Sequence, residues 1–334
     1  MCSPDLTPAP SPKGEGRLPL VVIVGPTAVG KTEISLQLAE QLEGEIVSAD
    51  SRLFYRGMDI GTAKPTLVER ARVPHHLIDV AEPDEAWSLA VFQKAARQSI
   101  ADIHQRGRLP FLVGGTGQYI RAVTHGWTPP AQGPHLQLRS VLEDLAKVHG
   151  IYWLHERLKL LDSEAAEKID PRNLRRTIRA LEVIFITGRR FSDQRALGET
   201  PYHLLTIGLI RPRSELYARL DARIETMFVN GLLDEVQSLL GGGYSPDLPS
   251  LSAIGYRQCV SVLQGKMSRE QAVIEIKRAT RVFVRRQANW FKPDDPEIYW
   301  FNPGEVTVPW LAEFIRAFLL RTIEKKANNT ILNN

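Results

Sequence analysis

A glycine-bounded loop at residues 25–32 carries the residues best suited to binding phosphate. Its sequence, Gly-Pro-Thr-Ala-Val-Gly-Lys-Thr, matches the pattern G-x-x-x-x-G-K-[ST] at every fixed position. The apolar run 20–24 predicts a strand before the loop, and the apolar spacing of residues 33–39 predicts a helix after it. Glycines let successive N–H groups converge on a phosphate oxygen, and the helix N-terminus favours negative charge. The predicted diphosphate ligands are Gly25, Thr27, Ala28, Val29, Gly30, Lys31 and Thr32.

Asp50 is the second candidate. Residues 45–51 form a short run that predicts a strand, with Asp50 at its carboxyl end, where open α/β sheets place ligand-binding side chains. An Asp in that position is also a common helix cap or turn residue. The following segment, 55–65, contains two glycines, a threonine and two basic residues. It predicts either a second loop over an anionic ligand or a plain turn, and the residues alone leave both open.

A third apolar run, 109–113, ends in Gly114-Gly115-Thr116-Gly117. A phosphate-loop enzyme that hydrolyses nucleotides needs a carboxylate near this position to hold magnesium and orient water. Backbone amides and the Thr116 hydroxyl can contact a ligand, but they cannot activate water as a carboxylate does. The pattern therefore argues against hydrolysis.

Length and composition define the elements that position these groups. The chain has 334 residues, 43% hydrophobic and 24% charged, which predicts one large domain with an insertion or second domain. We predict an α/β fold: a phosphate-loop core with a parallel sheet flanked by helices, and an all-helical insertion. The expected parts are a disordered extension (1–17), the core (18–124 and 202–325), the insertion (125–201) and a frayed tail (326–334). Two cysteines and the absence of a long apolar run favour a cytoplasmic protein without a membrane span.

Basic residues recur at helical spacing in two separate regions. Arg175, Arg176 and Arg179 follow Arg172 in the insertion, and a second set runs through residues 277–292 with aromatic residues between the charges. A charged helix face is often only solvated surface. Two helix faces whose charges are nearly all positive, however, favour binding to the phosphate backbone of a nucleic acid. Residues 256–258, Tyr-Arg-Gln, could stack on and hydrogen-bond an unpaired base. A further helix, predicted to be capped by Ser214 and to end at residues 241–243, carries two arginines four residues apart.

Taken together, these motifs resemble the tRNA dimethylallyltransferase family. The resemblance is carried by residues 25–32, 48–51, 55–65, 75–79, 113–117, 179–183, 255–258 and 285–287, in that order, and covers about residues 20–300. It implies transfer of a dimethylallyl group from dimethylallyl diphosphate to N6 of adenine 37 in tRNAs that read codons beginning with U. It also implies that the insertion binds tRNA and that Mg2+ accompanies the diphosphate. We expect a monomer.

The resemblance also implies roles for individual residues. Asp50 would take the N6 proton, and Thr116 and Lys31 would act at the reacting centre. Thr32 would contact Mg2+, with Asp50 as a candidate second ligand, and Arg223 would add a guanidinium to the diphosphate, with Arg219 as second choice. The expected tRNA contacts are Asp50, Ser51, Arg52, Leu53, Arg175, Arg176, Thr177, Ile178, Arg179, Ser252, Ala253, Ile254, Gly255, Tyr256, Arg257, Arg281 and Arg285.

Some positions depart from the family pattern. Leu53 and Phe54 replace a more common Gln-Val, Val29 replaces a small residue, and Asn289 stands where threonine is frequent. None of these changes removes a group that the reaction needs.

Three rival functions share part of the evidence: a phosphate-loop kinase or nucleoside triphosphatase, an adenylate dimethylallyltransferase, and an RNA-binding protein without catalysis. The glycine-rich segment after residue 113 argues against a kinase or triphosphatase. The two basic regions argue against an enzyme that prenylates a free nucleotide, and the intact phosphate loop with Asp50 argues against a protein without catalysis.

Overall fold

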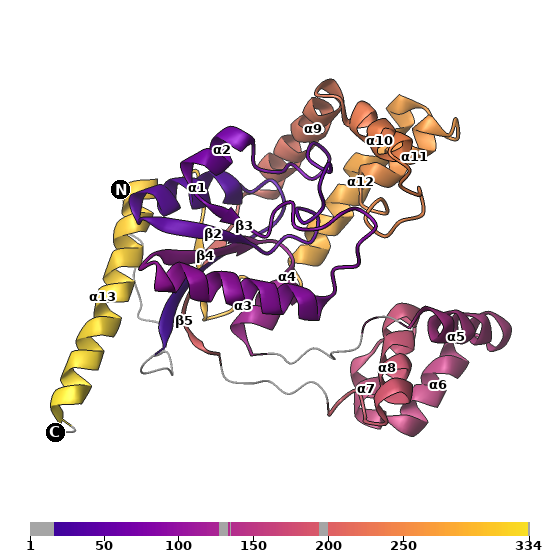
Figure 1. Ribbon diagram of the computed structural model, residues 1–334, viewed down its shortest axis with the longest axis horizontal. Coiled ribbons are helices and arrows are strands. Elements are labelled where there is room, and N and C mark those ends of the chain that lie inside the picture. The colour runs from indigo at the N-terminus through magenta and orange to yellow at the C-terminus, as the bar shows by residue number, and fades with distance from the viewer. Residues whose placement is uncertain (1–16, 127–132, 134, 194–199, 333–334) are drawn as a thin grey trace.

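One parallel sheet of six strands forms the centre of the protein (Figure 1). The computed structural model describes residues 17–126, 133, 135–193 and 200–332, and their side chains as far as residue 320. The strands are β1 (Leu18–Val24), β2 (Gly44–Ser48), β3 (His75–His76), β4 (Leu109–Gly114), β5 (Tyr202–Leu209) and β6 (Ile298–Phe301). Their order is β3-β2-β4-β1-β5-β6, and every pairing is parallel. The carboxyl ends of β2, β4 and β1 therefore lie side by side.

Helices cover both faces of this sheet. α1 (Lys31–Gln41) and α13 (Val308–Leu332) lie on one face, and α3 (Leu89–Gln105) and α4 (Gly117–Thr124) lie on the other. The short α2 (Leu67–Arg72) has no buried residue and lies next to α1. Successive side chains of a strand point to opposite faces. Val21 and Ile23 of β1 accordingly pack with α1 and α13, whereas Leu20, Val22 and Val24 pack with α3 and α4. Burial on both faces is why β1 is apolar throughout.

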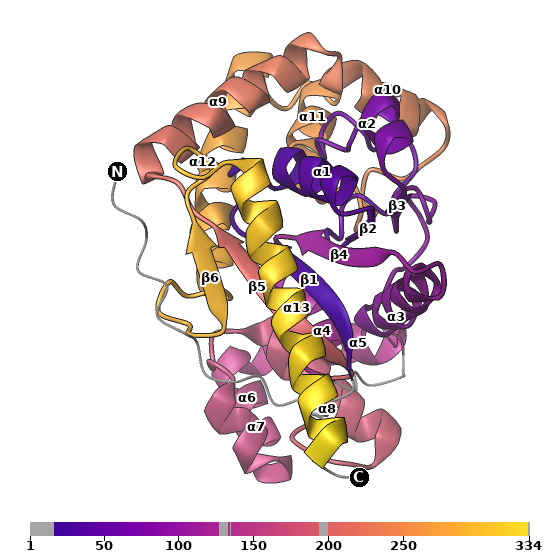
Figure 2. The same ribbon diagram turned by 90° about the vertical axis from the view of Figure 1, so that its left-hand side faces the viewer.

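Four more helices form a group that arches over one side of the sheet (Figure 2), and two of them contact the phosphate loop. They are α9 (Arg213–Val229), α10 (Leu232–Gly241), α11 (Tyr256–Leu263) and α12 (Arg269–Gln287). The single helix predicted to run to residues 241–243 is wrong, because Gly231 adopts φ 93° and separates α9 from α10. Ser214 is not the cap either: the helix begins at Arg213, and Pro212 occupies the N-cap position.

The inserted segment contains only helices in its described part. They are α5 (Leu136–His149), α6 (Ile151–Leu161), α7 (Ser163–Lys168) and α8 (Leu174–Thr187). Figure 1 shows them as a separate unit, apart from the sheet. They share a core of their own, with Leu154, Leu158 and Leu181 almost fully buried. The carboxylate of Glu182, also fully buried, accepts hydrogen bonds from the guanidinium of Arg139 and fixes α8 against α5.

The ends of the chain differ from the expectation in one respect. Residues 1–16, expected to be disordered, lie outside the described residues. The last helix continues to Leu332, through most of the expected frayed tail. Residues 311–327 contain neither Gly nor Pro, and Lys, Glu and Ala favour helix there. Within the described residues, none of the helices combines the length and the apolar character that crossing a membrane requires.

Candidate active site

The phosphate loop joins β1 to α1 with a backbone that few residues could adopt. Gly25 has φ 148° and Gly30 has φ 110°, and a side chain at residue 25 would place its Cβ 2.6 Å from the carbonyl oxygen of Leu209. Lys31 Nζ donates to the carbonyl oxygens of Gly25 (3.0 Å) and Pro26 (2.9 Å). Lys31, near the end of the loop, thus fixes the backbone at the start of the loop.

Two arginines hold the outer side of the same loop. Arg211 Nε donates to the carbonyl oxygen of Val29 at 2.9 Å, and Arg219 Nε donates to that of Ala28 at 3.1 Å. With these carbonyl groups directed toward cations, the neighbouring N–H groups remain for an anion. In the part of the chain that the structure describes, the amides of Ala28, Gly30, Lys31 and Thr32 have no hydrogen-bond acceptor. Together with the N-terminus of α1, they form an anion site.

Gln287, at the end of α12, belongs to a segment that carries the family resemblance, but the sequence motifs predict no role for it in the site. Its Oε1 accepts a hydrogen bond from the amide of Thr27 at 2.9 Å, and its Nε2 donates to the carbonyl oxygen of Gly115 at 3.2 Å. The side chain is 7% exposed. A Cβ at Gly115 would lie 2.4 Å from Gln287 Nε2, so only glycine permits this approach. Gln287 therefore connects the phosphate loop with the segment that carries Thr116.

The charges of Lys31, Asp50 and Arg223 influence one another. Burial lowers the pKa of Lys31 to about 8, the carboxylate of Asp50 opposes this shift, and the guanidinium of Arg223 adds to it. Burial, and then the neighbouring charge of Arg219, also lower the pKa of Arg223. The structure thus brings the predicted diphosphate cations and the predicted base into one cluster. An anion bound in the loop would relieve the repulsion between the cations.

Asp50 lies where β2 meets β4. The amide of Ala49 donates to the carbonyl oxygen of Val113 at 2.8 Å, which places Asp50 beside the Gly114–Thr116 turn. Asp50 Oδ1 accepts a hydrogen bond from the amide of Arg52 at 3.0 Å, so one carboxylate oxygen is fixed by a turn. Asp50 also contributes, after burial and Tyr55, to raising the pKa of Tyr119 to about 12. The carboxylate and the start of α4 therefore line the same space.

The position of Thr116 agrees with a ligand-contacting role. Thr116 occupies the N-cap position of α4, yet its hydroxyl does not cap that helix. The side chain is partly exposed at the carboxyl end of β4, between the ends of β2 and β1. The nearby Phe54, one of the departures from the family pattern, is fully buried and stacks on Tyr119 with ring centroids 5.8 Å apart. It supports the floor of the site and does not line it.

The oxygen donors beside the loop fit a magnesium ion. Thr32 is exposed at the first turn of α1, and Asp50 supplies a carboxylate. Magnesium is usually held by one or two protein oxygens together with substrate phosphates and water. Among the described residues, no three His, Cys, Asp or Glu side chains form a group that could hold a metal by themselves. A magnesium ion here would depend on the diphosphate for the rest of its ligands.

An apolar cavity of about 200 Å³ opens beside the phosphate loop. Gly25 and Pro26 form one side of it, and Leu216, Phe291 and Trp300 contribute apolar walls. The polar groups at its edge include Arg211 and Gln287, which also hold the loop. An anionic group and a short hydrocarbon chain can thus bind side by side at this point.

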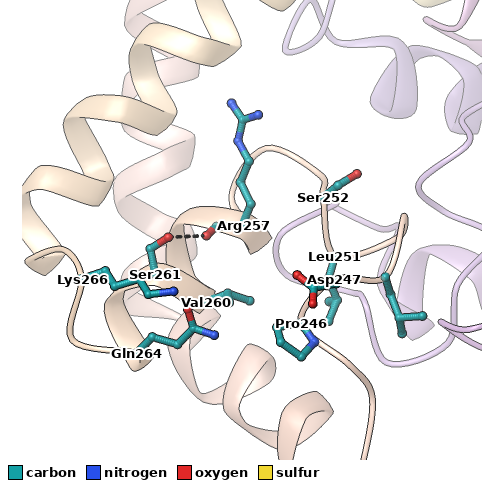
Figure 3. Close-up of a pocket in the computed structure, with 10 residues that line it drawn as sticks. Pro246, Asp247, Leu251, Ser252, Arg257, Val260, Ser261, Gln264 and Lys266 are labelled. Atoms are coloured by element: carbon teal, nitrogen blue, oxygen red, sulfur yellow. Dashed lines mark hydrogen bonds between the residues drawn. The ribbon is translucent and has the colours of Figure 1, made fainter. Parts of the chain in front are cut away.

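The segment around α11 presents a different kind of surface. Ser252 and Arg257 are exposed and line an open cavity of about 500 Å³, together with Asp247 and Lys266 (Figure 3). The base-stacking role predicted for Tyr256 is wrong, because its ring is fully buried. Gln258 caps its own helix by accepting from the amide of Gly255, and Ala253 is buried as well. Of this segment, Ser252, Ile254 and Arg257 retain accessible side chains.

Loop 55–65, left open between ligand binding and a plain turn, binds an anion from the same chain. The amides of Asp59, Ile60 and Gly61 all donate to the carboxylate of Glu235. The buried Lys64 is paired with the carboxylates of Asp59 and Asp79. The positive charge of Lys64 is therefore neutralised by carboxylates of the same chain.

The two basic regions are less uniform than their spacing indicates. On α8, Arg175 and Arg176 are exposed, whereas Thr177 and Ile178 are buried in the core of the insertion and Arg179 is paired with Glu182. Arg172 precedes the helix, whose N-cap is Asn173, and pairs with Asp170, so it does not share the face.

On α12, Arg281 is paired with Asp221 of α9 at 2.5 Å and lies over the ring of Tyr217. Arg285, one turn later, is exposed. Figure 1 shows α8 in the separate helical unit, far from the strand ends that carry the phosphate loop. The predicted tRNA-binding residues therefore form separate surfaces: Asp50 lies near Lys31 of the phosphate loop, and Arg285 lines the cavity beside Gly25.

Comparison with known proteins places this arrangement in a family. A model of the IPP transferase family matches residues 53–294. The chain is 55% identical over 275 residues to the tRNA dimethylallyltransferase of Roseiflexus sp. strain RS-1, covering 82% of this chain and 90% of the relative. It is 45% identical over 312 residues to the tRNA dimethylallyltransferase of Thermomicrobium roseum, covering 93% and 94% of the two chains.

Solved structures agree with this comparison. The full-length tRNA isopentenylpyrophosphate transferase from Bacillus halodurans superposes with a TM-score of 0.68 at 42% identity, covering 93% of this chain and 99% of that one. A eukaryotic dimethylallyltransferase acting on tRNA superposes with a TM-score of 0.72 at 27% identity, covering 85% and 73%. The predicted α/β core with its parallel sheet and phosphate loop is confirmed. The chain belongs to the IPP transferase family and is a tRNA-modifying transferase of that family.

Proposed function

We propose that this protein transfers a dimethylallyl group from dimethylallyl diphosphate to N6 of adenine 37, in the anticodon loop of tRNAs that read codons beginning with U. One arrangement carries the proposal: the phosphate loop, Asp50 and Thr116 follow three neighbouring parallel strands. Glycines stand where a hydrolytic enzyme would need a carboxylate. The names of the relatives support a dimethylallyl donor and a tRNA acceptor.

The diphosphate of the donor would bind in the phosphate loop. The free amides of residues 28 and 30–32 and the N-terminus of α1 would donate to its oxygens, and Lys31 and Arg223 would offset its charge. The apolar cavity beside Gly25 supports a hydrocarbon chain as the other half of the donor. Thr32 and Asp50 would contact Mg2+, which, when bound, supplies further positive charge to the leaving group.

The reaction would be a displacement at C1 of the dimethylallyl group. The N6–C1 bond forms, the C1–O bond to the diphosphate breaks, and the diphosphate leaves with the electron pair of that bond. The lone pair of N6 is delocalised into the adenine ring, so the amine is a weak nucleophile. Asp50 would accept a hydrogen bond from N6 and take its proton, while Thr116 would contact the reacting centre.

The target adenine is stacked in the anticodon loop, so it would have to be extruded to reach Asp50. Residues 50–53 would contact it at the strand ends. The surrounding RNA would be held by Arg175, Arg176 and Arg179 of the insertion, by the accessible residues Ser252, Ile254 and Arg257, and by Arg281 and Arg285 of α12. Every group named belongs to one chain, and we propose that it acts as a monomer.

A transfer assay tests the proposal. Dimethylallyl diphosphate labelled in the prenyl group is incubated with the protein and Mg2+, and an anticodon stem-loop with adenines at 36, 37 and 38 competes with AMP as acceptor. We expect label on the stem-loop alone. Replacing adenine 37 by guanine provides the matched RNA control and should abolish labelling.

Other outcomes lead to different functions. Label on AMP alone would mean that the protein transfers the prenyl group, but to a free nucleotide and not to RNA. Turnover of a nucleoside triphosphate without a prenyl donor, with no label on either acceptor, would indicate the kinase or triphosphatase and overturn the proposal.

A further inference from the structure

Glu235 is an acid of α10 whose carboxylate accepts four hydrogen bonds. The donors are the successive amides of Asp59 (2.8 Å), Ile60 (2.7 Å) and Gly61 (3.2 Å), together with the phenol hydroxyl of Tyr256 (2.5 Å). Three successive amides that converge on one anion form a backbone anion site. Here the anion comes from the chain itself, about 175 residues further along the sequence.

The surrounding residues are shaped for this contact. A Cβ at Gly61 would lie 2.5 Å from the ring of Tyr256, so the loop reaches the ring only because residue 61 is glycine. Lys64, 9% exposed, donates to the carboxylates of Asp59 and Asp79 and to the carbonyl oxygen of Tyr55. The loop is thus held from both sides.

The contact joins two parts of the proposed site. Loop 59–61 lies nine residues after Asp50 along the same connection, and Tyr256 begins α11, next to the exposed Arg257. A second link runs parallel to it: Arg52 Nη1 donates to the carbonyl oxygens of Pro249 (3.3 Å) and Ser250 (3.4 Å). Both links fix the 249–257 segment relative to the turn that carries Asp50.

We propose that Glu235 is a positioning residue: its carboxylate fastens loop 59–61 to Tyr256 and so sets the position of Ser252 and Arg257 relative to Asp50. RNA that binds the α11 segment then presents its adenine to the base. This inference rests on the proposed function. It assigns no contact between Glu235 and either substrate, and it leaves the diphosphate site independent of Glu235.

The test compares Glu235→Ala, Tyr256→Phe and the control Asp234→Asn, an exposed neighbour on α10. For each, kcat/KM for the stem-loop and the Kd of a non-reactive dimethylallyl diphosphate analogue are measured. A displacement of about 1 Å can cost about 10²-fold in rate, so we expect Glu235→Ala to lose at least tenfold in kcat/KM for RNA with an unchanged Kd for the analogue. Tyr256→Phe removes one of four hydrogen bonds and should lose less, and Asp234→Asn should match the wild type.

A rescue experiment separates positioning from general loss of structure. Glu235→Ala leaves the three amides without their anion, and formate can fill the vacated space. Formate should restore part of kcat/KM for RNA in Glu235→Ala and have no effect in Asp234→Asn. Wild-type kcat/KM in Glu235→Ala, a parallel loss of analogue binding, or no response to formate would each overturn the inference. An inactive wild-type protein would instead overturn the proposed function.

Discussion

Two loops of this protein direct successive backbone amides at an anion, and they differ in where the anion comes from. In loop 25–32 the carbonyl groups are held by Lys31, Arg211 and Arg219, and four amides remain without an acceptor among the described residues. In loop 59–61 the amides already donate to Glu235. Loop 25–32 and the segment 55–65, which contains loop 59–61, both carry glycine, threonine and basic residues, so composition permits anion binding in each case.

The difference between the loops teaches what makes such a site available to a ligand. In the first loop, the cations Lys31, Arg219 and Arg223 outnumber the nearby carboxylate of Asp50, and the pKa of Lys31 is lowered by burial and by the charge of Arg223. In the second, the charge of Lys64 is matched by Asp59 and Asp79, and the amides are matched by Glu235. An excess of positive charge distinguishes the binding site from the structural one.

The largest expected effect concerns the carboxylate closest to the available loop. Asp50→Ala should lower kcat by about 10²–10⁴-fold, the range typical of a lost general base, because N6 then has no acceptor for its proton. Binding of tRNA, measured by filter retention, should remain as in the wild type. Asp84→Ala, at an exposed aspartate, is the control. A wild-type rate in Asp50→Ala would remove Asp50 from the role of base.

A substitution at Gln287 would make the first loop resemble the second. In Gln287→Glu, a carboxylate replaces the amide group that now accepts from Thr27, so the loop gains an anion of its own. Two unit charges 4 Å apart repel by about 4 kcal/mol at an effective dielectric constant of 20, and solvent reduces this, so we expect a loss of about ten- to a hundredfold in affinity for the dimethylallyl diphosphate analogue. Calorimetric titration measures it.

The uncharged variant Gln287→Leu is the matched control for that experiment. It removes both hydrogen bonds of Gln287, from Thr27 and to Gly115, without adding charge, whereas the carboxylate of Gln287→Glu can still accept from Thr27. Its affinity for the analogue should lie between those of the wild type and Gln287→Glu. Equal losses in the two variants would mean that the hydrogen bonds, and not the charge, decide whether the loop is available.

The exposed arginines of the insertion extend the same comparison to RNA. Arg175 and Arg176 have no acidic partner among the described residues, whereas Arg179 is paired with Glu182. Reversing both charges (Arg175→Glu with Arg176→Glu) should weaken tRNA binding by at least about tenfold and flatten its salt dependence by about 1.4 in the log–log slope, as for two phosphate contacts of a single strand. Lys159→Glu, exposed on α6, is the control. Unchanged tRNA binding in the double variant would mean that the face of α8 with Arg175 and Arg176 is only solvated surface.

Sequence patterns predicted the parts of the fold that depend on neighbouring residues. The strands that end before Gly25, Asp50 and Gly115 coincide with short runs of apolar or strand-forming residues. The strand ends bring these residues together because parallel strands align their carboxyl ends. The phosphate loop and Asp50 could therefore be placed at the same edge of the sheet from local patterns alone.

Contacts between distant segments could not be predicted in this way. Gln287 meets Thr27 across 260 residues, and Glu235 meets the loop at 59–61 across about 175. Tyr256 has the residue type of a base-stacking side chain, yet it packs into the core because Gly61 leaves room for its ring. Whether a polar side chain serves a ligand or the protein depends on such partners, and local spacing does not contain that information.

The smallest expected effect is the pH dependence of binding in the first loop. Lys31 has a pKa lowered to about 8 in the free protein. A bound diphosphate raises that pKa, so above pH 8 binding requires the uptake of a proton and affinity falls as pH rises. For a pKa of about 8, the Kd of the dimethylallyl diphosphate analogue should rise about fourfold between pH 7 and pH 8.5.

The variant Lys31→Arg decides whether Lys31 causes this dependence. A guanidinium keeps its charge to above pH 12, so the Kd of the variant should be independent of pH from 7 to 8.5, whatever its absolute affinity. The diphosphate ester is fully ionised over most of this range and contributes little. A variant that retains the rise would assign it to another group. A wild-type Kd that stays constant would show that Lys31 is already fully charged in the free loop. The excess of positive charge there would then be larger than its pKa indicates.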